Sequence, residues 1–321
     1  MRDDIVRNTP PEVDLEHCVC PMGCPPGESH VLRGRDRLHD LPGIFDIVRC
    51  NTCGLMRTDP RPTRETIGYY YPFNYGPYQY PTNGSGTGQN GSFLHKALSQ
   101  LVEFNTERIP PVKPGRLFEV GCGGGGFLRK MAEAGWQVEG LDFAPDPVQR
   151  LCEEGYAVHC SSLEDFERPD VTPDIVVGWM VLEHLYDPLG SLRKIYSWLD
   201  NNGWLVLSVP NERVRTAWWA GDAWFNRQLP THLQHFDINS LQNMLERADF
   251  QVHKVLHQRF MGSIFETVAY VLDDRRQCPR LAQACRKAAR SPLASYALYP
   301  LGWLFAAFGQ TGRITVWARK K

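Results

Sequence analysis

The chain of 321 residues lacks an excess of charge of either sign, with 35 basic and 36 acidic side chains and a formal net charge of −1. This balance argues against attraction of the whole molecule to nucleic acid or to an anionic membrane. The first residues lack an apolar run, so we expect no signal peptide and a cytoplasmic location. The composition, 42% hydrophobic and 22% charged, is typical of a folded globular protein with room for one large domain and a smaller one.

Long uncharged runs are also rare, and the one exception lies near the end of the chain. Residues 291–312 contain no charged side chain, but Ser, Tyr, Gln and a central Pro300 make the run a poor membrane span. We expect a buried helix or a lid segment here. The alternative is a peripheral membrane contact, helped by the basic residues of 286–290 and 319–321 on either side.

Cysteines are sparse except near the N-terminus, where five of the ten lie between Cys18 and Cys53. In a cytoplasmic chain this clustering favours metal binding over disulfides. Cys50 and Cys53 have the two-residue spacing of a zinc knuckle and are followed by glycine. The cysteines in the first half of the cluster, Cys18, Cys20 and Cys24, have an irregular spacing. We predict that Cys20 and Cys24 complete a structural Zn²⁺ site, with Cys18 as the substitute for one of them. Free thiols are the alternative.

The chain divides into three parts. Residues 1–60 form a zinc-ribbon-like module, and residues 61–110 form a tyrosine-rich helix followed by a linker rich in Gly and Ser. Residues 111–321 alternate strand and helix signals, with a helical insertion at 263–310. The predicted strands of this third part are 116–120, 137–142, 157–160, 174–181, 204–210, 251–260 and 313–320.

Amphipathic helices follow these apolar strands. Phe127, Leu128 and Met131 recur at helical spacing after the first strand, and Asp237 is a candidate N-cap of a later helix. Apolar strands that alternate with such helices indicate a parallel sheet covered on both faces. The last two strands are not joined by an ordinary crossover. We therefore predict an α/β fold with a Rossmann-like sheet of seven strands, the last of them antiparallel.

The turn after the first of these strands reads FEVGCGGGGF over residues 118–127. Glycine loses more backbone freedom than any other residue on folding, so such a run indicates a ligand lying against bare backbone. Gly121, Gly123 and Gly126 satisfy the G-x-G-x-x-G fingerprint, and Asp142 ends the next strand. Taken alone, the pattern fits an NAD site as well as a site for a methyl donor.

Other motifs favour the methyl donor. Residues 114–260 resemble the class I S-adenosylmethionine-dependent methyltransferases. The motifs that carry the resemblance are EVGCGGG, GLD, SSLEDF, VLEH-x-x-DP, GWLVLSVPN and PTHLQHFDINSL. The resemblance implies that Glu119 and the loop Gly121, Cys122, Gly123 and Gly125 receive the methionine end of the donor. It implies that Asp142 binds the ribose, that Phe143, Ser162 and Leu163 flank the adenine, and that Trp179 lies near the sulfonium. Cys122 itself is interpreted as a small apolar filler.

The group that accepts the methyl must be made nucleophilic by removal of a proton. Histidine is suited to remove that proton near neutral pH. His184 lies at the carboxyl end of a predicted strand, with Glu183 beside it to orient the ring or to bind a substrate hydroxyl. His232 and His235 precede a later helix and are further candidates. The alternatives are loop support for His184, and capping or loop hydrogen bonds for His232 and His235.

A second resemblance concerns the acceptor. The run from Arg35 to Thr63 is similar to the N-terminal modules of bacterial sugar methyltransferases, in which a structural ribbon helps to enclose the substrate. This implies a sugar or glycan acceptor, with aromatic surface supplied by residues 69–80. Nucleic acid is not the expected partner, although arginines such as Arg33 and Arg37 keep RNA, or another small metabolite, as an alternative.

Overall fold

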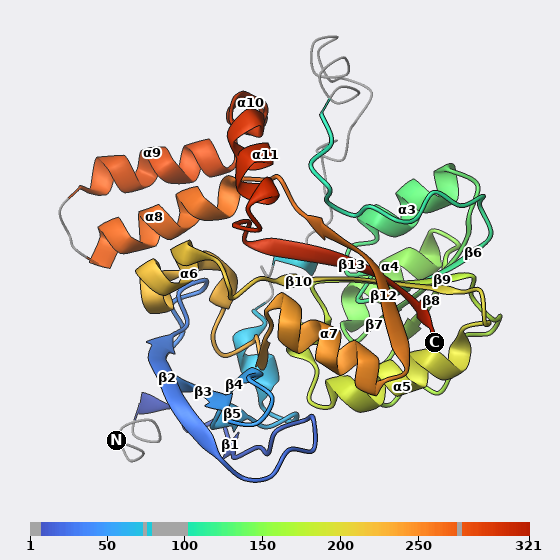
Figure 1. The fold of residues 1–321 in the computed structure, drawn as a ribbon, viewed down its shortest axis with the longest axis horizontal. Coiled ribbons are helices and arrows are strands. Elements are labelled where there is room, and N and C mark those ends of the chain that lie inside the picture. The colour runs from blue at the N-terminus through green and yellow to red at the C-terminus, as the bar shows by residue number, and fades with distance from the viewer. Residues whose placement is uncertain (1–7, 73–75, 79–101, 275–277) are drawn as a thin grey trace.

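The computed structural model describes residues 8–72, 76–78, 102–274 and 278–321. Most of the predicted Gly- and Ser-rich linker, and part of the tyrosine-rich run, lie outside the described residues. Figure 1 shows a large sheet with helices on both faces, a smaller sheet built mainly from the N-terminal part, and a group of helices that projects from one end.

The large sheet has the seven strands predicted from the sequence. They are β6 (Arg116–Val120), β7 (Gln137–Asp142), β8 (Ala157–Cys160), β9 (Ile175–Trp179), β10 (Trp204–Pro210), β12 (Phe250–His257) and β13 (Arg313–Lys320). Their order across the sheet is β12-β13-β10-β9-β6-β7-β8. Strand β13 lies antiparallel between β10 and β12, whereas β9 pairs in parallel with both β6 and β10. The predicted fold class is therefore confirmed.

Four helices cover the faces of this sheet. They are α3 (Gly126–Glu133), α4 (Pro145–Glu153), α5 (Pro188–Trp198) and α7 (Ile238–Arg247). Successive residues of a strand point to opposite faces. Accordingly, Phe118 packs in the core with Leu192 of α5 and Leu241 of α7, whereas its neighbour Leu117 packs with Phe127 of α3. The predicted N-cap is confirmed, because the carboxylate of Asp237 accepts a hydrogen bond from the backbone of α7.

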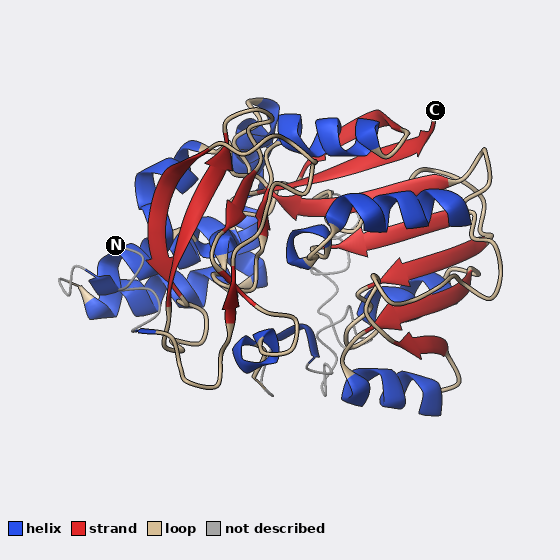
Figure 2. Ribbon diagram, turned by 90° about the horizontal axis from the view of Figure 1, so that it is seen from below, coloured by secondary structure: helices blue, strands red, loops and turns tan. Residues whose placement is uncertain are grey.

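The smaller sheet combines three strands of the N-terminal part with one strand from the third part of the chain. Its strands, in the order β11-β4-β3-β2, are β2 (Glu28–Arg35), β3 (Ile44–Cys50), β4 (Met56–Thr58) and β11 (Gln234–His235). A separate pair consists of β1 (Leu15–Glu16) and β5 (Arg61–Pro62), followed by the 3₁₀ turns η1 (Ile67–Tyr70) and η2 (Gly76–Tyr78). Because β11 comes from the region predicted as the third part, the N-terminal module is completed by a strand from far along the chain. Figure 2 shows the two sheets side by side.

The predicted helical insertion lies between β12 and β13. It contains α8 (Gly262–Asp274), α9 (Pro279–Ala289), α10 (Pro292–Ala297) and α11 (Tyr299–Ala307), and Figure 1 shows it projecting at one end of the sheet. The expectation of a buried helix at 291–312 is wrong. No residue of α10 is buried, and in α11 only Gly302 is. Within the described ranges, no helix is long and apolar enough to cross a membrane.

Four shorter elements complete the assignment of the described residues. They are α6 (Arg215–Ala220) and the 3₁₀ turns η3 (Leu182–His184), η4 (Gly221–Ala223) and η5 (Phe225–Arg227). Turn η3 follows β9 and carries both Glu183 and His184. Helix α6 follows β10 and lies on the same side of the molecule as the insertion (Figure 1).

The core between α5 and the sheet can be tested by truncation. Leu192 is fully buried there, and we expect Leu192→Ala to lower the free energy of unfolding by about 2–5 kcal/mol, through lost apolar burial and the cavity left behind. Leu281→Ala is the control, because Leu281 is 52% exposed and its truncation should change stability by less than about 0.5 kcal/mol. Urea unfolding monitored by circular dichroism measures both, and equal effects would contradict the assigned core.

Candidate active site

A cleft of about 570 Å³ lies at the carboxyl ends of β6, β7 and β9. Open α/β sheets bind their ligands at this edge. One wall is the glycine-rich turn between β6 and α3. The opposite wall includes Arg64, Ile67, Tyr71 and Tyr78, so the N-terminal part of the chain encloses the cleft together with the large sheet.

The glycine turn has a conformation that other residues rarely adopt. Gly121 and Gly123 have φ values of +70° and +47°, and Gly125 has +75°. A Cβ atom on Gly121 would lie 2.4 Å from Cγ2 of Val181, and one on Gly125 would lie 2.3 Å from Leu151. Side chains are therefore excluded from this loop for two reasons. Its backbone has left-handed φ values, and it packs tightly against neighbouring side chains.

Two carboxyl groups lie at this turn. The side chain of Asp142 accepts hydrogen bonds from the backbone of Gly123 at 2.8 Å and of Ala144 at 2.9 Å, and its oxygens also line the cleft. Burial raises the pKa of Asp142. Glu119 is 3% exposed, and its Oε2 has no hydrogen-bond partner. An unpaired buried carboxyl oxygen is costly, and it favours a donor group that arrives with a ligand.

Most of the predicted donor-binding residues line one cleft. Those that do are Gly121, Gly123, Asp142, Phe143, Ser162, Leu163 and Trp179. Cys122 and Gly125 are not among the lining residues. Cys122 packs instead with Leu128 in an apolar cluster, in keeping with its interpretation as a filler, and burial raises the pKa of its thiol. Glu119 lies behind the loop on β6.

Aromatic side chains gather at one side of the cleft. The rings of Tyr71 and Tyr78 meet Phe143 edge-on, with centroids 5.5 and 6.0 Å away. Phe143 is 51% exposed towards this space. Trp179 packs edge-on against Phe127 at 5.1 Å, and its indole nitrogen has no partner. Rings arranged in this way can hold a flat base or the apolar face of a sugar.

His184 is held in a defined orientation over the cleft. Its Nδ1 lies 2.9 Å from the carbonyl oxygen of Thr231 and 2.8 Å from the hydroxyl of Tyr71. A carbonyl oxygen can only accept a hydrogen bond, so Nδ1 carries the proton and Nε2 keeps its lone pair. Burial lowers the pKa of His184 to about 4. The ring is therefore neutral near pH 7 and can accept a proton through Nε2.

Glu183 and His232 lie next to this histidine. The rings of His184 and His232 meet edge-on with centroids 4.7 Å apart, and the ligand atoms of Glu183, His184 and His232 lie within 4.8 Å of one another. Both carboxyl oxygens of Glu183 and Nδ1 of His232 are buried without a partner. Burial raises the pKa of Glu183 to about 8, whereas that of His232 is lowered, mainly by burial and also by His184. All three groups are uncharged near pH 7.

His235 has different surroundings from the other predicted histidines. It lies on β11 outside the cleft, where its Nε2 is 3.0 Å from Oγ1 of Thr58 and its Nδ1 is 3.5 Å from Glu212. Glu212 in turn pairs with the guanidinium of Arg227, and this pair holds the pKa of Glu212 at about 2 despite its burial. These contacts support the structural alternative for His235 and give no contact with the cleft for a catalytic role.

Several lining residues escaped the sequence interpretation. Arg64, Met180, Gln228 and Arg313 all border the cleft. Met180 has a φ of +59°, which is uncommon for a residue other than glycine and often marks functional sites. Its position directly after β9 was the available signal. Arg64 and Gln228 come from segments that reach the cleft only through the tertiary fold.

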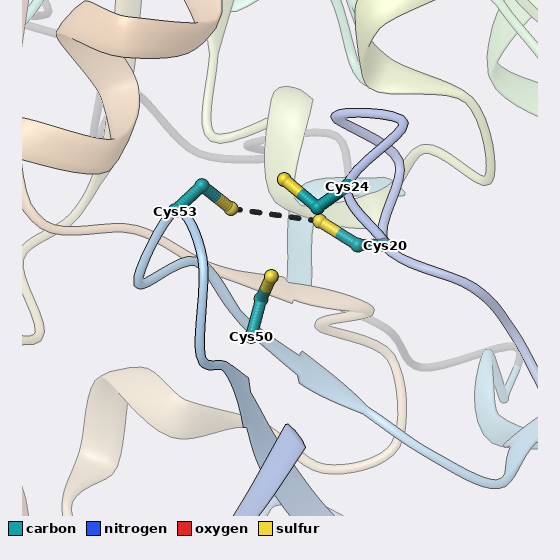
Figure 3. Close-up of side chains that lie close together, drawn as sticks. All are labelled: Cys20, Cys24, Cys50 and Cys53. Atoms are coloured by element: carbon teal, nitrogen blue, oxygen red, sulfur yellow. Dashed lines mark hydrogen bonds between the residues drawn. The ribbon is translucent and has the colours of Figure 1, made fainter. Parts of the chain in front are cut away.

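The cysteine cluster lies apart from the cleft, between the smaller sheet and α7. The sulfur atoms of Cys20, Cys24, Cys50 and Cys53 lie within 4.8 Å of one another, and those of Cys20 and Cys53 are 3.5 Å apart. Figure 3 shows the four side chains converging from two loops. Cys18 is not part of the group, because its thiol lies 3.6 Å from the carbonyl oxygen of Thr58.

Comparison with known proteins agrees with this geometry. The profile of the methyltransferase domain family matches residues 91–255, just over half of the chain. The chain belongs to the methyltransferase domain family. The prediction of a methyltransferase is thus confirmed, and the cleft described above lies within the methyltransferase domain and the N-terminal segments that cover it.

Curated relatives of the methyltransferase domain include two ubiquinone biosynthesis O-methyltransferases. One, from Cereibacter sphaeroides, is 34% identical over 156 residues, which cover 43% of this chain and 63% of the relative. The other, from Xanthomonas axonopodis pv. citri, is 33% identical over 152 residues, covering 44% of this chain and 63% of the relative. The chain thus spans less than two thirds of the length of these relatives.

Solved structures similar to this chain include a [4+2]-cyclase and several proteins that are named as methyltransferases. An S-adenosylmethionine-dependent methyltransferase from Mesorhizobium loti has a TM-score of 0.43 at 19% identity and covers 70% of this chain and 96% of its own. One from Thermotoga maritima has a TM-score of 0.47 at 15% identity and covers 71% of this chain and 93% of its own.

The raised pKa of Glu183 predicts how stability depends on pH. Burial raises the pKa of Glu183 from its ordinary value of 4.5 to about 8, so the folded chain keeps a proton on this carboxyl up to about pH 8. Glu183 therefore makes its full contribution to stability below the pKa that it has in the unfolded chain. This contribution is lost as the pH rises through about 8. Glutamine mimics the protonated form. We expect Glu183→Gln to melt higher relative to the parent chain at about pH 9 than at about pH 5.

Differential scanning calorimetry at the two pH values measures this difference. Glu133→Gln is the control, because Glu133 is an exposed residue of α3. A melting-temperature difference between Glu183→Gln and the parent that is the same at both pH values would show that Glu183 is ionised in the folded chain.

Proposed function

We propose that the protein transfers the methyl group of S-adenosylmethionine to a hydroxyl group of a sugar or glycan intermediate, with His184 as the general base. The observation that carries this proposal is the orientation of His184, which faces the cleft across from the glycine turn with Nδ1 tied to Thr231. A neutral imidazole held by a carbonyl is suited to take a proton from a bound hydroxyl.

The donor side of the cleft fits S-adenosylmethionine. The unpaired Oε2 of Glu119 lies behind the glycine turn, where an ammonium group of the methionine end would supply the missing hydrogen bonds. Asp142 keeps lone pairs free beside its two backbone bonds, so that it can accept hydrogen bonds from ribose hydroxyls. Ser162 and Leu163 border the place expected for the adenine, next to Phe143.

When bound, the donor supplies a methyl group that is already activated by its positive sulfur, so alignment is the main task of the protein. The acceptor oxygen attacks the methyl carbon, the carbon–sulfur bond breaks, and its electron pair stays on sulfur. Nε2 of His184 takes the proton of the hydroxyl. Tyr71 and Thr231 keep the ring aligned, and the resulting imidazolium can return its proton to solvent through the cleft.

The acceptor side favours a sugar. Tyr71, whose ring centroid lies 6.1 Å from that of His184, forms an aromatic wall, and Arg64 and Gln228 offer polar groups in the lining. Such a combination is common where a ring with one apolar face and several hydroxyls is bound. A phenolic acceptor is the second candidate, favoured by the same aromatic wall and by the ubiquinone biosynthesis O-methyltransferases among the relatives.

The four clustered cysteines are proposed to hold a structural Zn²⁺ ion. Their number and mutual distances suit a closed tetrahedral site. Each pair is followed or interrupted by a glycine with positive φ, Gly23 at +66° and Gly54 at +78°, which allows the chain to turn around an ion. The backbone of Met22 accepts a hydrogen bond from Arg247 at the end of α7, so this loop is also tied to the large sheet. Thiolate ligands of this kind agree with the expected cytoplasmic location.

The role of His184 is tested by His184→Gln. We expect the single-turnover rate of methyl transfer to fall by about 10²–10⁴-fold, because the base is lost, with unchanged affinity for S-adenosylhomocysteine. Radiolabelled donor and a panel of nucleotide sugars, glycans and catechols measure transfer, and calorimetry measures affinity. His253→Ala is the control, because His253 is exposed on β12. Transfer by His184→Gln at the rate of the parent chain would refute the assigned base.

The zinc proposal is tested by Cys50→Ser, with Cys18→Ser as a matched control. We expect Cys50→Ser to lose stoichiometric zinc and to melt at a lower temperature, because metal binding contributes directly to folding. Cys18→Ser should keep the metal, since Cys18 lies outside the cluster. Atomic absorption and thermal melting decide, and retention of one zinc per chain with an unchanged melting temperature in Cys50→Ser would contradict the site.

A further inference from the structure

The insertion exposes an apolar surface to solvent. Leu293 of α10 is 70% exposed, and Trp303 and Phe308 at α11 are 54% and 73% exposed. A helix that is apolar all round is normally buried in a core or in a membrane. Helix α11 is of this kind, yet only Gly302 is buried in it. Something outside the described chain is therefore expected to cover this face.

Helix α6 extends the same surface. A groove of about 510 Å³ is lined by Arg215 and Thr216 of α6 and by Leu304, Phe305 and Phe308 at α11. Trp218 and Trp219, further along α6, are 55% and 60% exposed. We name the exposed apolar side chains of α6, α10 and α11 together the insertion face. Tryptophans at the rim of such a face are typical of proteins that lie in the interface of a bilayer.

The charge around the insertion face is positive. Arg213, Arg215 and Lys287 are exposed, and none of them forms an ion pair with an acidic side chain of the described residues. The acidic side chains of α8 are already paired. Glu266 lies near Arg290, Asp273 pairs with Arg286, and Asp274 pairs with Arg37. Although the whole chain carries a net charge of −1, unpaired basic groups therefore flank the apolar surface.

The insertion face also lies next to the reacting centre. A second cavity, of about 530 Å³, shares the lining residues Trp179 and Met180 with the donor cleft. It is also lined by Arg290 and by Ser291 and Tyr296 of the α10 region. A molecule bound at α10 would thus lie against a cavity that shares its lining with the cleft.

We propose that the insertion face seats the protein on the surface of an anionic lipid bilayer, and that the acceptor reaches the cleft from the membrane as an amphipathic or lipid-linked molecule. A surface with aromatic and aliphatic side chains in its centre and unpaired Arg and Lys around it matches the interface of anionic lipids in both polarity and charge. The statement about the acceptor rests on the proposed function, whereas the statement about the bilayer does not.

Vesicle flotation of the full chain tests the proposal. Vesicles of phosphatidylcholine alone are compared with vesicles that also contain phosphatidylglycerol, and we expect binding to the second kind that weakens as salt is added. The double variant Trp303→Ser/Phe308→Ser removes two large exposed side chains, and we expect it to bind at least about tenfold more weakly. Both residues are exposed, so thermal melting should be unchanged.

Matched controls separate apolar insertion from charge. Val171→Ser removes an apolar side chain that is 40% exposed elsewhere on the molecule, and we expect no change in binding. Arg213→Gln/Arg215→Gln should weaken binding to the anionic vesicles and reduce its dependence on salt, because fewer charges then meet the lipid headgroups.

Three outcomes would overturn the proposal. They are no flotation with either kind of vesicle, unchanged flotation of the double variant, and a concentration-dependent dimer that the double variant abolishes while vesicles remain unbound. The last would assign the face to contact between two copies of the chain. Methyl transfer to a soluble acceptor without vesicle binding would support the proposed function and refute the membrane proposal. Vesicle binding without any donor binding would support the membrane proposal and refute the proposed function.

Discussion

The geometry of the candidate site depends on one backbone segment that is hydrogen-bonded on both sides. The N–H of Leu233 donates to the carbonyl of Glu183 at 2.7 Å, and its own carbonyl accepts from the N–H of Thr58 at 3.0 Å. The hydroxyl of Thr58 donates to the carbonyl of His232 at 2.8 Å. The segment thus connects the smaller sheet to the turn that carries His184. Movement of the N-terminal part would shift the histidine relative to the glycine turn.

The second constraint on this site is that its buried titratable side chains are uncharged. Glu183 and His232 lie in the interior beside His184, and their pKa values are displaced towards the uncharged forms. Neutral side chains cost less to bury than charged ones, so burial keeps the surroundings of His184 uncharged. A donor that brings its own positive charge and an acceptor that must lose a proton both fit such surroundings.

Local patterns in the sequence were sufficient to predict the strands of the large sheet. Strands β6, β7, β8, β10 and β13 have the predicted bounds, and the runs of β6, β7 and β10 end at Gly121, Asp142 and Pro210. The glycine turn and Asp142 were found for the same reason, since the loop and the acid both lie next to their strands in the chain. Within the cysteine cluster, the sequence left Cys18 as a substitute for Cys20 or Cys24, and the fold groups Cys20 with the other three sulfurs.

The missed features all depend on contacts between distant segments. Arg64 reaches the cleft only because the N-terminal part folds over the edge of the sheet. His235 looked equivalent to His232 in sequence, but the pairing of β11 with β4 turns it towards Thr58 and Glu212. The uncharged run 291–312 indicated burial, yet in its helices α10 and α11 only Gly302 is buried. Sequence shows that a side chain is apolar, but not what covers it.

The central claim is that the bare glycine turn receives the amino-acid end of a methyl donor and not the pyrophosphate of a dinucleotide. Calorimetric titration of the purified chain with S-adenosylhomocysteine and, separately, with NADH tests it most directly. The account predicts one S-adenosylhomocysteine bound per chain, binding that is lost in Asp142→Ala, and no heat from NADH. Binding of NADH with no response to S-adenosylhomocysteine would contradict it.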